Sequence, residues 1–438
     1  MKQGPADPGQ ACKELRDILN LCVKCGRCRA VCPVFQAVGE EPAAARGKLA
    51  LLEACLNRGG KLTGKRLQDV ISLCLLCGRC TANCPNGAGA REAVELARSI
   101  LAQQGELALP KRFLSRLSSM ERSSRDPWVR TATLLQRLLM RELPQDRGLV
   151  LRLGGSGLRD LWAPRLRPPF FLERCREVVG KGKERVALFV GCAIHYLAPE
   201  IGEATLGILG GMGLEVIIPE GQGCCGLMAW GMGDVHGAAL MARKVVEQFG
   251  QEDLEAILVP CASCAFHLSK GIPSLLREDP MGPRATLMAG KVRELSLFLA
   301  ERHVSSSLGE EQDRPTGARL AYHDPCHLAV GMGIRSQPRE LLARLAGWNY
   351  VEMPGAEECC GMGGSFRIFH PRVAARISGR KLRAIQEAQV QVVATTCMGC
   401  WMSLQEMLHR AGTRVTVRHV AELLWEELGE TDGFQPRA

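Results

Sequence analysis

Eight cysteines near the start of the chain fall into two copies of one spacing. In each copy two residues separate the first three cysteines, three more precede the fourth, and a proline follows it. The two copies are Cys22, Cys25, Cys28 and Cys32, and Cys74, Cys77, Cys80 and Cys84. Thiolates two residues apart in a tight turn converge on three corners of one cube. The spacing therefore predicts ligands of cubane [4Fe–4S] clusters.

The fourth cysteine of each copy lies too far along the chain to close the same cube, and in this motif it ligates the other cluster. We therefore predict one cluster on Cys22, Cys25, Cys28 and Cys84, and a second on Cys74, Cys77, Cys80 and Cys32. Zinc favours two C-x2-C pairs separated by a longer loop. Disulfides need an oxidising compartment, and the residues after Met1 form no apolar signal core. We expect a cytoplasmic protein whose cysteines bind metal.

The basic charge of the chain is local. The formal net charge is +10, and residues 111–185 hold 18 Lys or Arg against 8 Asp or Glu, which accounts for all of it. A protein-wide basic face for nucleic acid is therefore not expected. The segment suits acidic lipid at the inner membrane face or an acidic partner, and equally a solvated linker. No apolar run is long enough for a membrane helix.

Ten further cysteines repeat one five-part pattern. Each copy contains a single cysteine, a Cys-Cys-Gly triplet and a C-x2-C pair, and equivalent positions are 134 to 136 residues apart. The first copy is Cys192, Cys224, Cys225, Cys261 and Cys264, and the second is Cys326, Cys359, Cys360, Cys397 and Cys400. This repetition predicts a duplicated domain with a metal or thiol site in each copy. Adjacent cysteines crowd an ordinary cubane, so spacing alone leaves the type of site open.

Short apolar runs that alternate with helical stretches predict α/β units with a parallel sheet in each copy. The expected strands are 185–190, 257–259, 319–322 and 392–394, and the expected helices are 199–211, 235–249, 338–346 and 371–388. The cysteines then lie at the carboxyl ends of strands and at helix starts, where α/β folds place their sites. We expect an α+β multidomain protein. Its parts are a helical two-cluster ferredoxin-like domain (1–105), a basic linker (106–184) and two cysteine-rich α/β repeats (185–305 and 316–430).

The doublet, the linker and the duplicated cysteine pattern together resemble the iron–sulfur subunit of bacterial glycolate oxidase (glycolate dehydrogenase). They are also similar to the fused iron–sulfur subunit of heterodisulfide reductase and to lactate-utilisation iron–sulfur proteins. The resemblance covers about residues 15–429 and includes the stretches NLCVKCGRCRAVCPVF, AYHDPCHL and CCGMGGSF. These motifs are specific for the superfamily and poorly specific for the substrate.

The resemblance implies up to four clusters. In the heterodisulfide-reductase branch, each complete repeat carries a noncubane [4Fe–4S] cluster on its five cysteines, and both repeats here are complete. The chain has no Walker A motif and no G-x-G-x-x-G after a clear strand, so it offers no flavin or NAD site. The implied role is the iron–sulfur subunit of a glycolate- or lactate-type 2-hydroxyacid oxidoreductase. It passes single electrons between an FAD-binding dehydrogenase partner, or another flavoprotein, and a downstream acceptor.

Two alternatives remain open at this point. One is a subunit of the heterodisulfide-reductase kind, which cleaves a disulfide at noncubane clusters; the neighbouring gene would distinguish it. The other is a zinc-stabilised protein whose basic linker binds nucleic acid, which a colourless preparation would reveal.

Several residues outside the cysteine sets also have two readings. His195 and His327 follow the first cysteine of each repeat and either tune a cluster or begin a helix. Gly361, Gly363 and Gly364 either line a channel or let the backbone approach a cluster. Arg27 and Arg79 either balance cluster charge or face solvent. The cysteines outside every motif are expected to be ordinary packed thiols; they are Cys12, Cys55 and Cys175.

Overall fold

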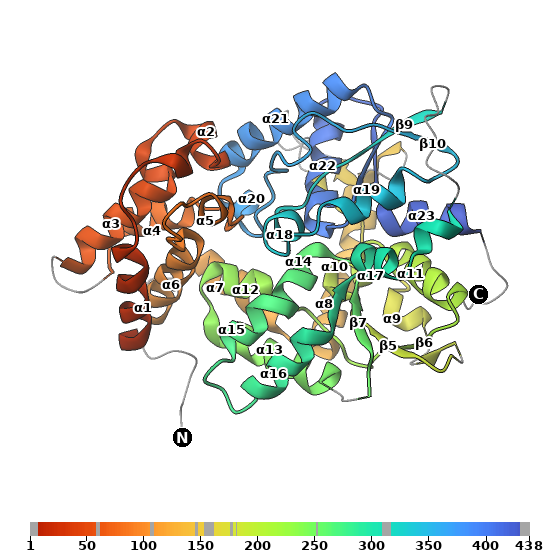
Figure 1. The fold of residues 1–438 in the computed structure, drawn as a ribbon, viewed down its shortest axis with the longest axis horizontal. Coiled ribbons are helices and arrows are strands. Elements are labelled where there is room, and N and C mark those ends of the chain that lie inside the picture. Colours follow the sequence, from red (N-terminus) through yellow and green to blue (C-terminus); the bar gives the residue numbers. More distant parts are fainter. Residues whose placement is uncertain are drawn as a thin grey trace.

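The computed structural model describes most of the chain, and its parts can be followed by colour in Figure 1. The described residues are 8–57, 62–105, 109–144, 148–152, 162–175, 178–180, 182–250, 253–308 and 317–429. A helical N-terminal domain lies at one end, beside both cysteine-rich repeats (Figure 1). The repeats lie against each other, and the segment between the N-terminal domain and the first repeat packs beside them.

The N-terminal domain contains helices and no strand among its described residues. Its α-helices are α1 (Pro8–Asn20), α2 (Pro33–Val38), α3 (Ala45–Asn57), α4 (Lys65–Ser72), α5 (Arg79–Ala82) and α6 (Ala90–Gln103). Apolar residues at helical spacing on α1, such as Leu15 and Leu19, are buried against α3 and α6. This packing brings the two cysteine loops together between the helices.

The basic segment is more structured than a linker. It forms α7 (Leu109–Ser119), α8 (Arg122–Leu139), α9 (Phe171–Arg174) and the strands β1 (Met140–Glu142), β2 (Leu149–Leu151), β3 (Trp162–Ala163) and β4 (Val178–Val179). The first three strands form a small antiparallel sheet, and β4 pairs antiparallel with a strand of the first repeat. Helix α7 packs on that repeat. Residues 153–161 lie outside the described part.

The first repeat is built on a parallel sheet, as predicted. Its strands are β5 (Arg185–Leu188), β6 (Glu215–Ile217), β7 (Ala256–Val259) and β8 (Val292–Glu294), in the spatial order β4-β6-β5-β7-β8. Its α-helices are α10 (Gly191–Leu197), α11 (Pro199–Gly211), α12 (Leu227–Met232), α13 (Val235–Phe249), α14 (Ala262–Phe266), α15 (Ile272–Leu275), α16 (Gly282–Lys291) and α17 (Leu295–Glu301). Strand β7 is buried along its whole length because helices cover both faces of the sheet.

The second repeat has the same plan with four parallel strands. They are β9 (Ala318–Tyr322), β10 (Trp348–Tyr350), β11 (Val392–Thr395) and β12 (Thr416–His419), in the order β10-β9-β11-β12. Its α-helices are α18 (Cys326–Ala329), α19 (Ser336–Leu342), α20 (Phe366–Phe369), α21 (Pro371–Ala388), α22 (Met398–Arg410) and α23 (Val420–Leu428). The predicted helices 199–211, 235–249 and 371–388 agree with α11, α13 and α21, whereas α19 begins and ends earlier than predicted.

The repeats pack against each other in a reciprocal manner. Helix α11 of the first repeat packs on α23 of the second, and α19 of the second packs on α17 of the first. The two helices α11 and α23 approach so closely that a Cβ atom on Gly207 would lie 2.5 Å from the ring of Trp425. One hydrophobic core runs through both repeats. This packing turns the carboxyl ends of the two sheets, and their cysteines, toward each other.

Candidate iron–sulfur sites

The two N-terminal cysteine loops have the same backbone path. The residue before the second cysteine of each loop, Lys24 or Leu76, has a positive φ, and so has the glycine after it, Gly26 or Gly78. Left-handed backbone at these two positions tightens the turn so that three thiols converge. The amide of Leu76 also donates to the Cys74 sulfur at 3.5 Å.

The fourth cysteine of each loop lies with the other loop. Cys84 lines one small cavity together with Cys22, Cys25 and Cys28, and Cys80 of the second loop reaches the same cavity. Cys32 instead lies near the second loop, where burial and, to a lesser extent, the charge of Cys32 raise the pKa values of Cys77 and Cys80. The backbone amide of Ala88 donates to the Cys84 sulfur at 3.3 Å, and that of Phe35 donates to the Cys32 sulfur at 3.4 Å. This arrangement is compatible with the crossed grouping, which stays a prediction.

The burial of these thiols favours metal-bound thiolates over free ionised thiolates. Burial raises the pKa of Cys77 to about 11, and burial likewise raises the pKa values of Cys28, Cys32 and Cys80. A metal displaces the protons that burial would retain, because only the thiolate is a ligand. Two sets of four thiols with amide donors to their sulfurs fit cubane clusters.

The first repeat gathers its five cysteines at the carboxyl edge of its sheet. Cys192 lies in the first turn of α10, the Cys-Cys pair precedes α12, and the C-x2-C pair begins α14. The Cys192 and Cys224 sulfurs are 3.8 Å apart. Cys225 and Cys261 each lie in hydrogen-bonding contact with Cys264. Five converging thiols exceed the four that one cubane needs.

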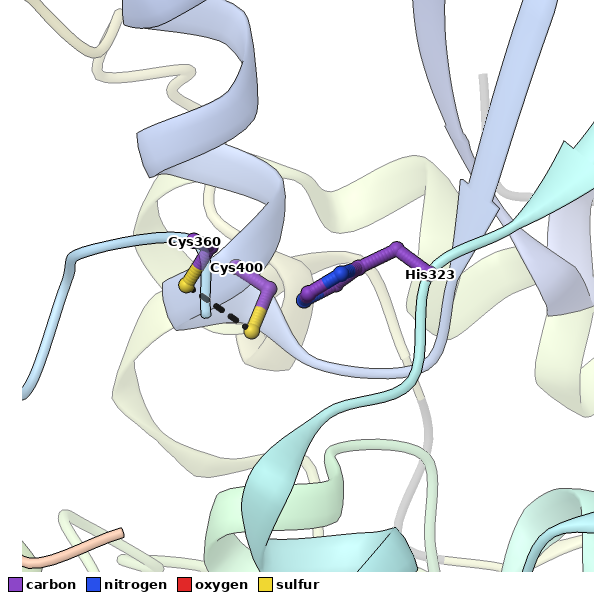
Figure 2. Close-up of side chains that lie close together, drawn as sticks. All are labelled: His323, Cys360 and Cys400. Atoms are coloured by element: carbon purple, nitrogen blue, oxygen red, sulfur yellow. Dashed lines mark hydrogen bonds between the residues drawn. The ribbon is translucent and has the colours of Figure 1, made fainter. Parts of the chain in front are cut away.

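The second repeat gathers the equivalent five cysteines more deeply. Its Cys-Cys pair and C-x2-C pair are buried, and the Cys360 and Cys400 sulfurs are 3.3 Å apart. The imidazole of His323 lies beside both sulfurs, as Figure 2 shows, with the ligand atoms of all three residues within 4.8 Å. The ring nitrogens of His323 are buried, and the imidazole lies in contact with the Cys360 thiol. A buried imidazole among thiols is suited to a metal site.

His323 was missed by the sequence reasoning, which singled out His195 and His327. The signal was the HDPC stretch, and the equivalent position in the first repeat is Phe189. His195 accepts a hydrogen bond from the Leu172 amide at 3.2 Å and packs on Phe170. His195 therefore helps to hold the linker segment against this repeat.

The two repeat sites meet at their C-x2-C loops. Cys261 lies in hydrogen-bonding contact with Cys397 of the other repeat. The hydroxyl of Ser263 lies 3.1 Å from the Cys397 sulfur and 2.9 Å from Nδ1 of His327. The Ala262 amide donates to the carbonyl of Thr396 at 2.8 Å. His327 is therefore linked to the Cys397 sulfur through Ser263. This link supports the interpretation that His327 tunes a cluster.

The N-terminal domain approaches the second repeat through Cys77. The charge of Cys77 influences the titration of both Cys326 and Cys359, and all three thiols are buried or partly buried. Arg79 lies in the same region and acts on Cys77 and Cys326, whereas Arg27 is exposed. Of the two interpretations, balancing of cluster charge therefore fits Arg79, and exposure to solvent fits Arg27.

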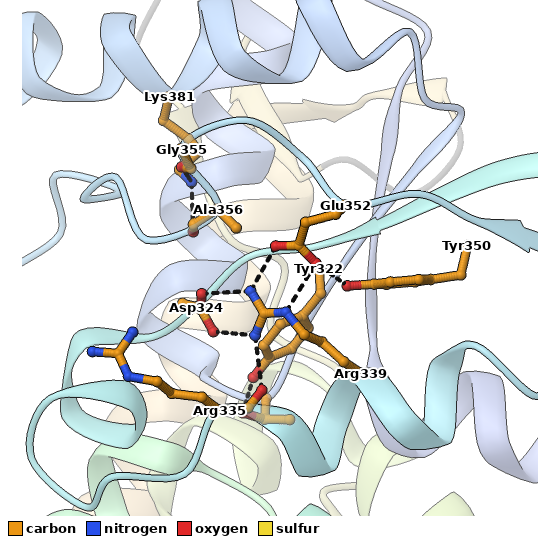
Figure 3. Close-up of polar contacts among 10 residues, drawn as sticks. Tyr322, Asp324, Arg335, Arg339, Tyr350, Glu352, Gly355, Ala356 and Lys381 are labelled. Carbon is orange, nitrogen blue, oxygen red and sulfur yellow. Dashed lines mark hydrogen bonds and ion pairs between the residues drawn. The ribbon is translucent and has the colours of Figure 1, made fainter.

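Charged side chains hold the loops that carry the second set (Figure 3). Arg339 donates two hydrogen bonds to Asp324, at 2.8 and 2.7 Å, and also contacts Glu352. Asp324 directly follows His323, so this fork fixes the loop that leads to Cys326. The ammonium of Lys381, fully buried, donates to the carbonyls of Gly355 and Ala356 and fixes the loop before the Cys-Cys pair.

Glycines and the remaining cysteines have packing roles. A Cβ atom on Gly361 would lie 2.7 Å from the carbonyl oxygen of Ala374, and one on Gly363 would lie 2.4 Å from the Leu75 side chain. These glycines therefore allow close packing around the second set. The cysteines outside the motifs pack against hydrophobic cores; they are Cys12, Cys55 and Cys175. Burial raises the pKa of Cys175 to about 12.

Two family models match the chain. The 4Fe-4S dicluster domain matches residues 18–88, and the cysteine-rich domain matches residues 186–269 and 320–405. These matches cover the N-terminal loops and both repeats, and they support iron–sulfur clusters as cofactors.

Curated relatives match over most of the chain. The chain is 28% identical over 425 residues to the probable glycolate oxidase iron–sulfur subunit of Bacillus subtilis, with 94% of each chain covered. It is 28% identical over 422 residues to the glycolate oxidase iron–sulfur subunit of Escherichia coli, with 95% of each covered. Lactate utilization protein A of Bacillus subtilis is 32% identical over 242 residues, which cover 55% of this chain and 98% of that protein. The chain therefore belongs to the family of iron–sulfur oxidoreductase subunits that includes the glycolate oxidase iron–sulfur subunits and lactate utilization protein A.

Proposed function

We propose that the chain is the electron-transfer subunit of a flavin-dependent 2-hydroxyacid oxidoreductase of the glycolate or lactate type. The observation that carries the proposal is the row of four cysteine sets that the fold creates. The N-terminal sets lie side by side, Cys77 adjoins the second repeat, and Cys261 adjoins Cys397 between the repeats. When bound, iron–sulfur clusters supply one-electron oxidation and reduction.

The ligand sets are part of this proposal, and the grouping supports them. Two cubane clusters are assigned to the N-terminal domain, one on Cys22, Cys25, Cys28 and Cys84, the other on Cys74, Cys77, Cys80 and Cys32. One further cluster is assigned to each repeat. Its ligands are Cys192, Cys224, Cys225, Cys261 and Cys264 in the first, and Cys326, Cys359, Cys360, Cys397 and Cys400 in the second. Five thiols, two of them adjacent, favour the noncubane type in both.

The two ends of the row are accessible, and the set of the second repeat is the most deeply buried. At one end Cys25 is exposed, and the flanking Val23 side chain is 63% exposed. At the other end Cys192 and Cys224 are partly exposed, whereas the Cys-Cys pair of the second repeat is buried. Such a row exchanges electrons with one partner at each end and shields the set of the second repeat from solvent. The exposed end beside Val23 suits the flavoprotein partner.

The chemistry on the hydroxyacid belongs to that partner. The names of the relatives refer to glycolate oxidase and to lactate utilization. This chain carries neither a Walker A motif nor a G-x-G-x-x-G motif after a clear strand. An FAD-binding hydroxyacid dehydrogenase therefore supplies the electrons, and a downstream acceptor takes them up.

A disulfide reductase is the second candidate. It is favoured by one observation: both repeats bring a complete set of five cysteines together. Reduction of an organic disulfide by the chain, without any hydroxyacid, would select this function.

The proposal is tested with anaerobically purified protein, its flavoprotein partner and glycolate or lactate. We expect about sixteen irons per chain for four four-iron clusters, and reduction of the clusters only when both the hydroxyacid and the flavoprotein are present. About eight irons would limit the clusters to the N-terminal domain. A fully loaded protein that the flavoprotein and hydroxyacid fail to reduce would contradict the proposed role.

Contact with a membrane surface is proposed for α8. Its exposed face carries Trp128, Leu135 and Leu138 beside the exposed Arg137. No described helix is long and apolar enough to cross a bilayer. An apolar stripe flanked by cations instead suits the interface of a bilayer with anionic lipid. Sedimentation with phosphatidylglycerol vesicles should bring the protein down at low salt, and phosphatidylcholine vesicles should not. Equal binding to both would contradict the charge argument.

A further inference from the structure

A cavity separate from the cysteine sets lies where all parts of the chain meet. It has a volume of about 220 Å³ and is lined by α4 and α6 of the N-terminal domain, by α7, by α12 of the first repeat and by α20 of the second. Its walls combine charged residues with apolar ones such as Leu101, Met232 and Phe366. Because four separate regions line this cavity, its shape depends on how these regions are positioned relative to one another.

Two cations line this cavity without an ionic partner. Arg98 donates its hydrogen bonds to backbone carbonyls, among them those of Ile71 at 3.1 Å and Cys74 at 2.7 Å. Carbonyls satisfy the N–H groups, and two nearby negative groups, Cys74 and Glu95, act on the guanidinium through charge rather than in a direct ion pair. Lys111 stands 5.3 Å from the centre of the Phe369 ring, and neither cation forms an ion pair among the described residues. Burial and the charge of Arg98 lower the pKa of Lys111 to about 8.

The remaining polar groups complete an amphiphilic lining. His370 and Ser72 share a hydrogen bond of 3.0 Å between Nε2 and Oγ. Asp69 is the one acidic side chain among the described lining residues, and it is exposed at the rim. Its charge acts on Lys111 and His370, and the less exposed part of the lining places the two cations next to apolar side chains such as Phe369.

We propose that this cavity binds a small organic anion whose carboxylate or phosphate group contacts Lys111 and whose apolar body lies against Phe366 and Phe369. An anion gives the two cations the direct ionic contact that they lack among the described residues, and charge-assisted hydrogen bonds in a partly desolvated site are strong ones. The aromatic rings exclude water from the other side of the ligand.

Binding has a consequence for the neighbouring cluster, and this consequence rests on the proposed function. Cys74 lines the cavity, and its carbonyl accepts a hydrogen bond from Arg98. A negative charge placed here opposes the addition of an electron to the cluster assigned to Cys74. An organic anion therefore lowers the reduction potential of that cluster and slows electron flow through the middle of the row.

The test uses the anaerobically purified holoprotein and benzoate as the probe, with neutral benzamide as its isosteric control. Calorimetry should show one saturable site for benzoate and none for benzamide. Lys111→Met should weaken benzoate binding by about tenfold or more, whereas Arg112→Met, which removes the exposed neighbouring cation, should not. Redox titration followed by EPR should show benzoate lowering the potential of one cluster.

The outcomes separate this site from the proposed function. Absence of saturable benzoate binding, equal binding of benzamide, or unchanged affinity of Lys111→Met would overturn the anion site. Normal binding with no change in any cluster potential would overturn the link to Cys74. Loss of iron or of reduction by the flavoprotein would concern the proposed function alone, since calorimetry reads the cavity independently of electron transfer.

Discussion

The hydroxyl of Ser263 in the first cysteine-rich repeat lies 3.1 Å from the sulfur of Cys397 in the second. Ser263 stands between the two cysteines of its own C-x2-C pair, and the equivalent residue of the second repeat is Gly399. The contact therefore runs in one direction only. One repeat supplies a hydrogen-bonding group to the site of the other, so the duplicated sites are not electronically equivalent.

Ser263→Ala should lower the reduction potential of the cluster in the second repeat. Hydrogen bonds to cluster sulfurs favour the more negative reduced state. Loss of one such bond, about 1 kcal/mol, corresponds to about 40 mV for one electron. EPR-monitored redox titration measures the shift at unchanged iron content. Ser269→Ala is the control, because the Ser269 hydroxyl donates to the Ala265 carbonyl of its own helix. Equal shifts in both variants would refute the role of the contact.

Cys84→Ala and Cys32→Ala should damage opposite clusters. Cys84 lies with the first cysteine loop, although it follows the second in sequence, and Cys32 lies with the second. Each variant should lose up to about four irons and one of the two N-terminal EPR signals, and the signals lost should differ. Iron analysis with EPR provides the measurement, and Cys55→Ala should retain both signals. If each variant damaged the cluster of its own loop, the crossed assignment would be wrong.

Arg339→Met should destabilise the second repeat. The substitution removes the fork that Arg339 makes with Asp324, whose carboxylate is largely buried. Charge-assisted hydrogen bonds of this kind contribute about 2 kcal/mol, so the melting temperature should fall measurably. Iron in the second repeat should also be lost more readily, because the His323–Cys326 loop is released.

The matched control is Arg335→Met on the same surface. Arg335 contributes only its backbone carbonyl to the group in Figure 3, as acceptor from Arg339 at 2.8 Å. Its side chain is exposed, so its loss should leave the melting temperature almost unchanged. Similar losses of stability in both variants would show that the fork to Asp324 has no special role.

Glu294 should make stability fall as the pH rises toward neutrality. Burial raises the pKa of Glu294 to about 7, from its ordinary value of 4.5, and Tyr322 lies near it. Between these two values the folded protein keeps a proton that the unfolded chain releases. The free energy of unfolding therefore decreases from about pH 4.5 to pH 7 and is constant above that, by up to about 3 kcal/mol.

Glu294→Gln should remove this pH dependence. A glutamine oxygen can still accept the Ser296 amide that Glu294 now caps at 2.9 Å. Thermal unfolding at pH 5.5 and pH 8 compares the variant with the wild type and with Glu220→Gln, which alters an exposed glutamate. Identical differences between the two pH values in all three proteins would argue that Glu294 is ionised in the fold.

Local pattern was sufficient for most elements. The buried run AILV formed β7, and the helix predicted for 235–249 begins where the Asp234 side chain caps it by accepting the Gly237 amide at 2.9 Å. The basic segment was harder to predict. Its strand β4 is only two residues long and is stabilised by pairing with β6, so nothing in its own sequence distinguishes it from a loop.

By itself, the sequence determined the division of the cysteines into a doublet and two repeats and the α/β plan of each repeat, and it predicted which cysteines bind iron. These depend on spacings within one motif, and a short spacing confines a loop to few conformations. Only the tertiary structure decided the order of the four sets, the position of His323 beside Cys360 and Cys400, and the cationic cavity at Lys111. Such contacts join residues far apart in the chain. They depend on the packing of whole helices and sheets, which no local spacing encodes.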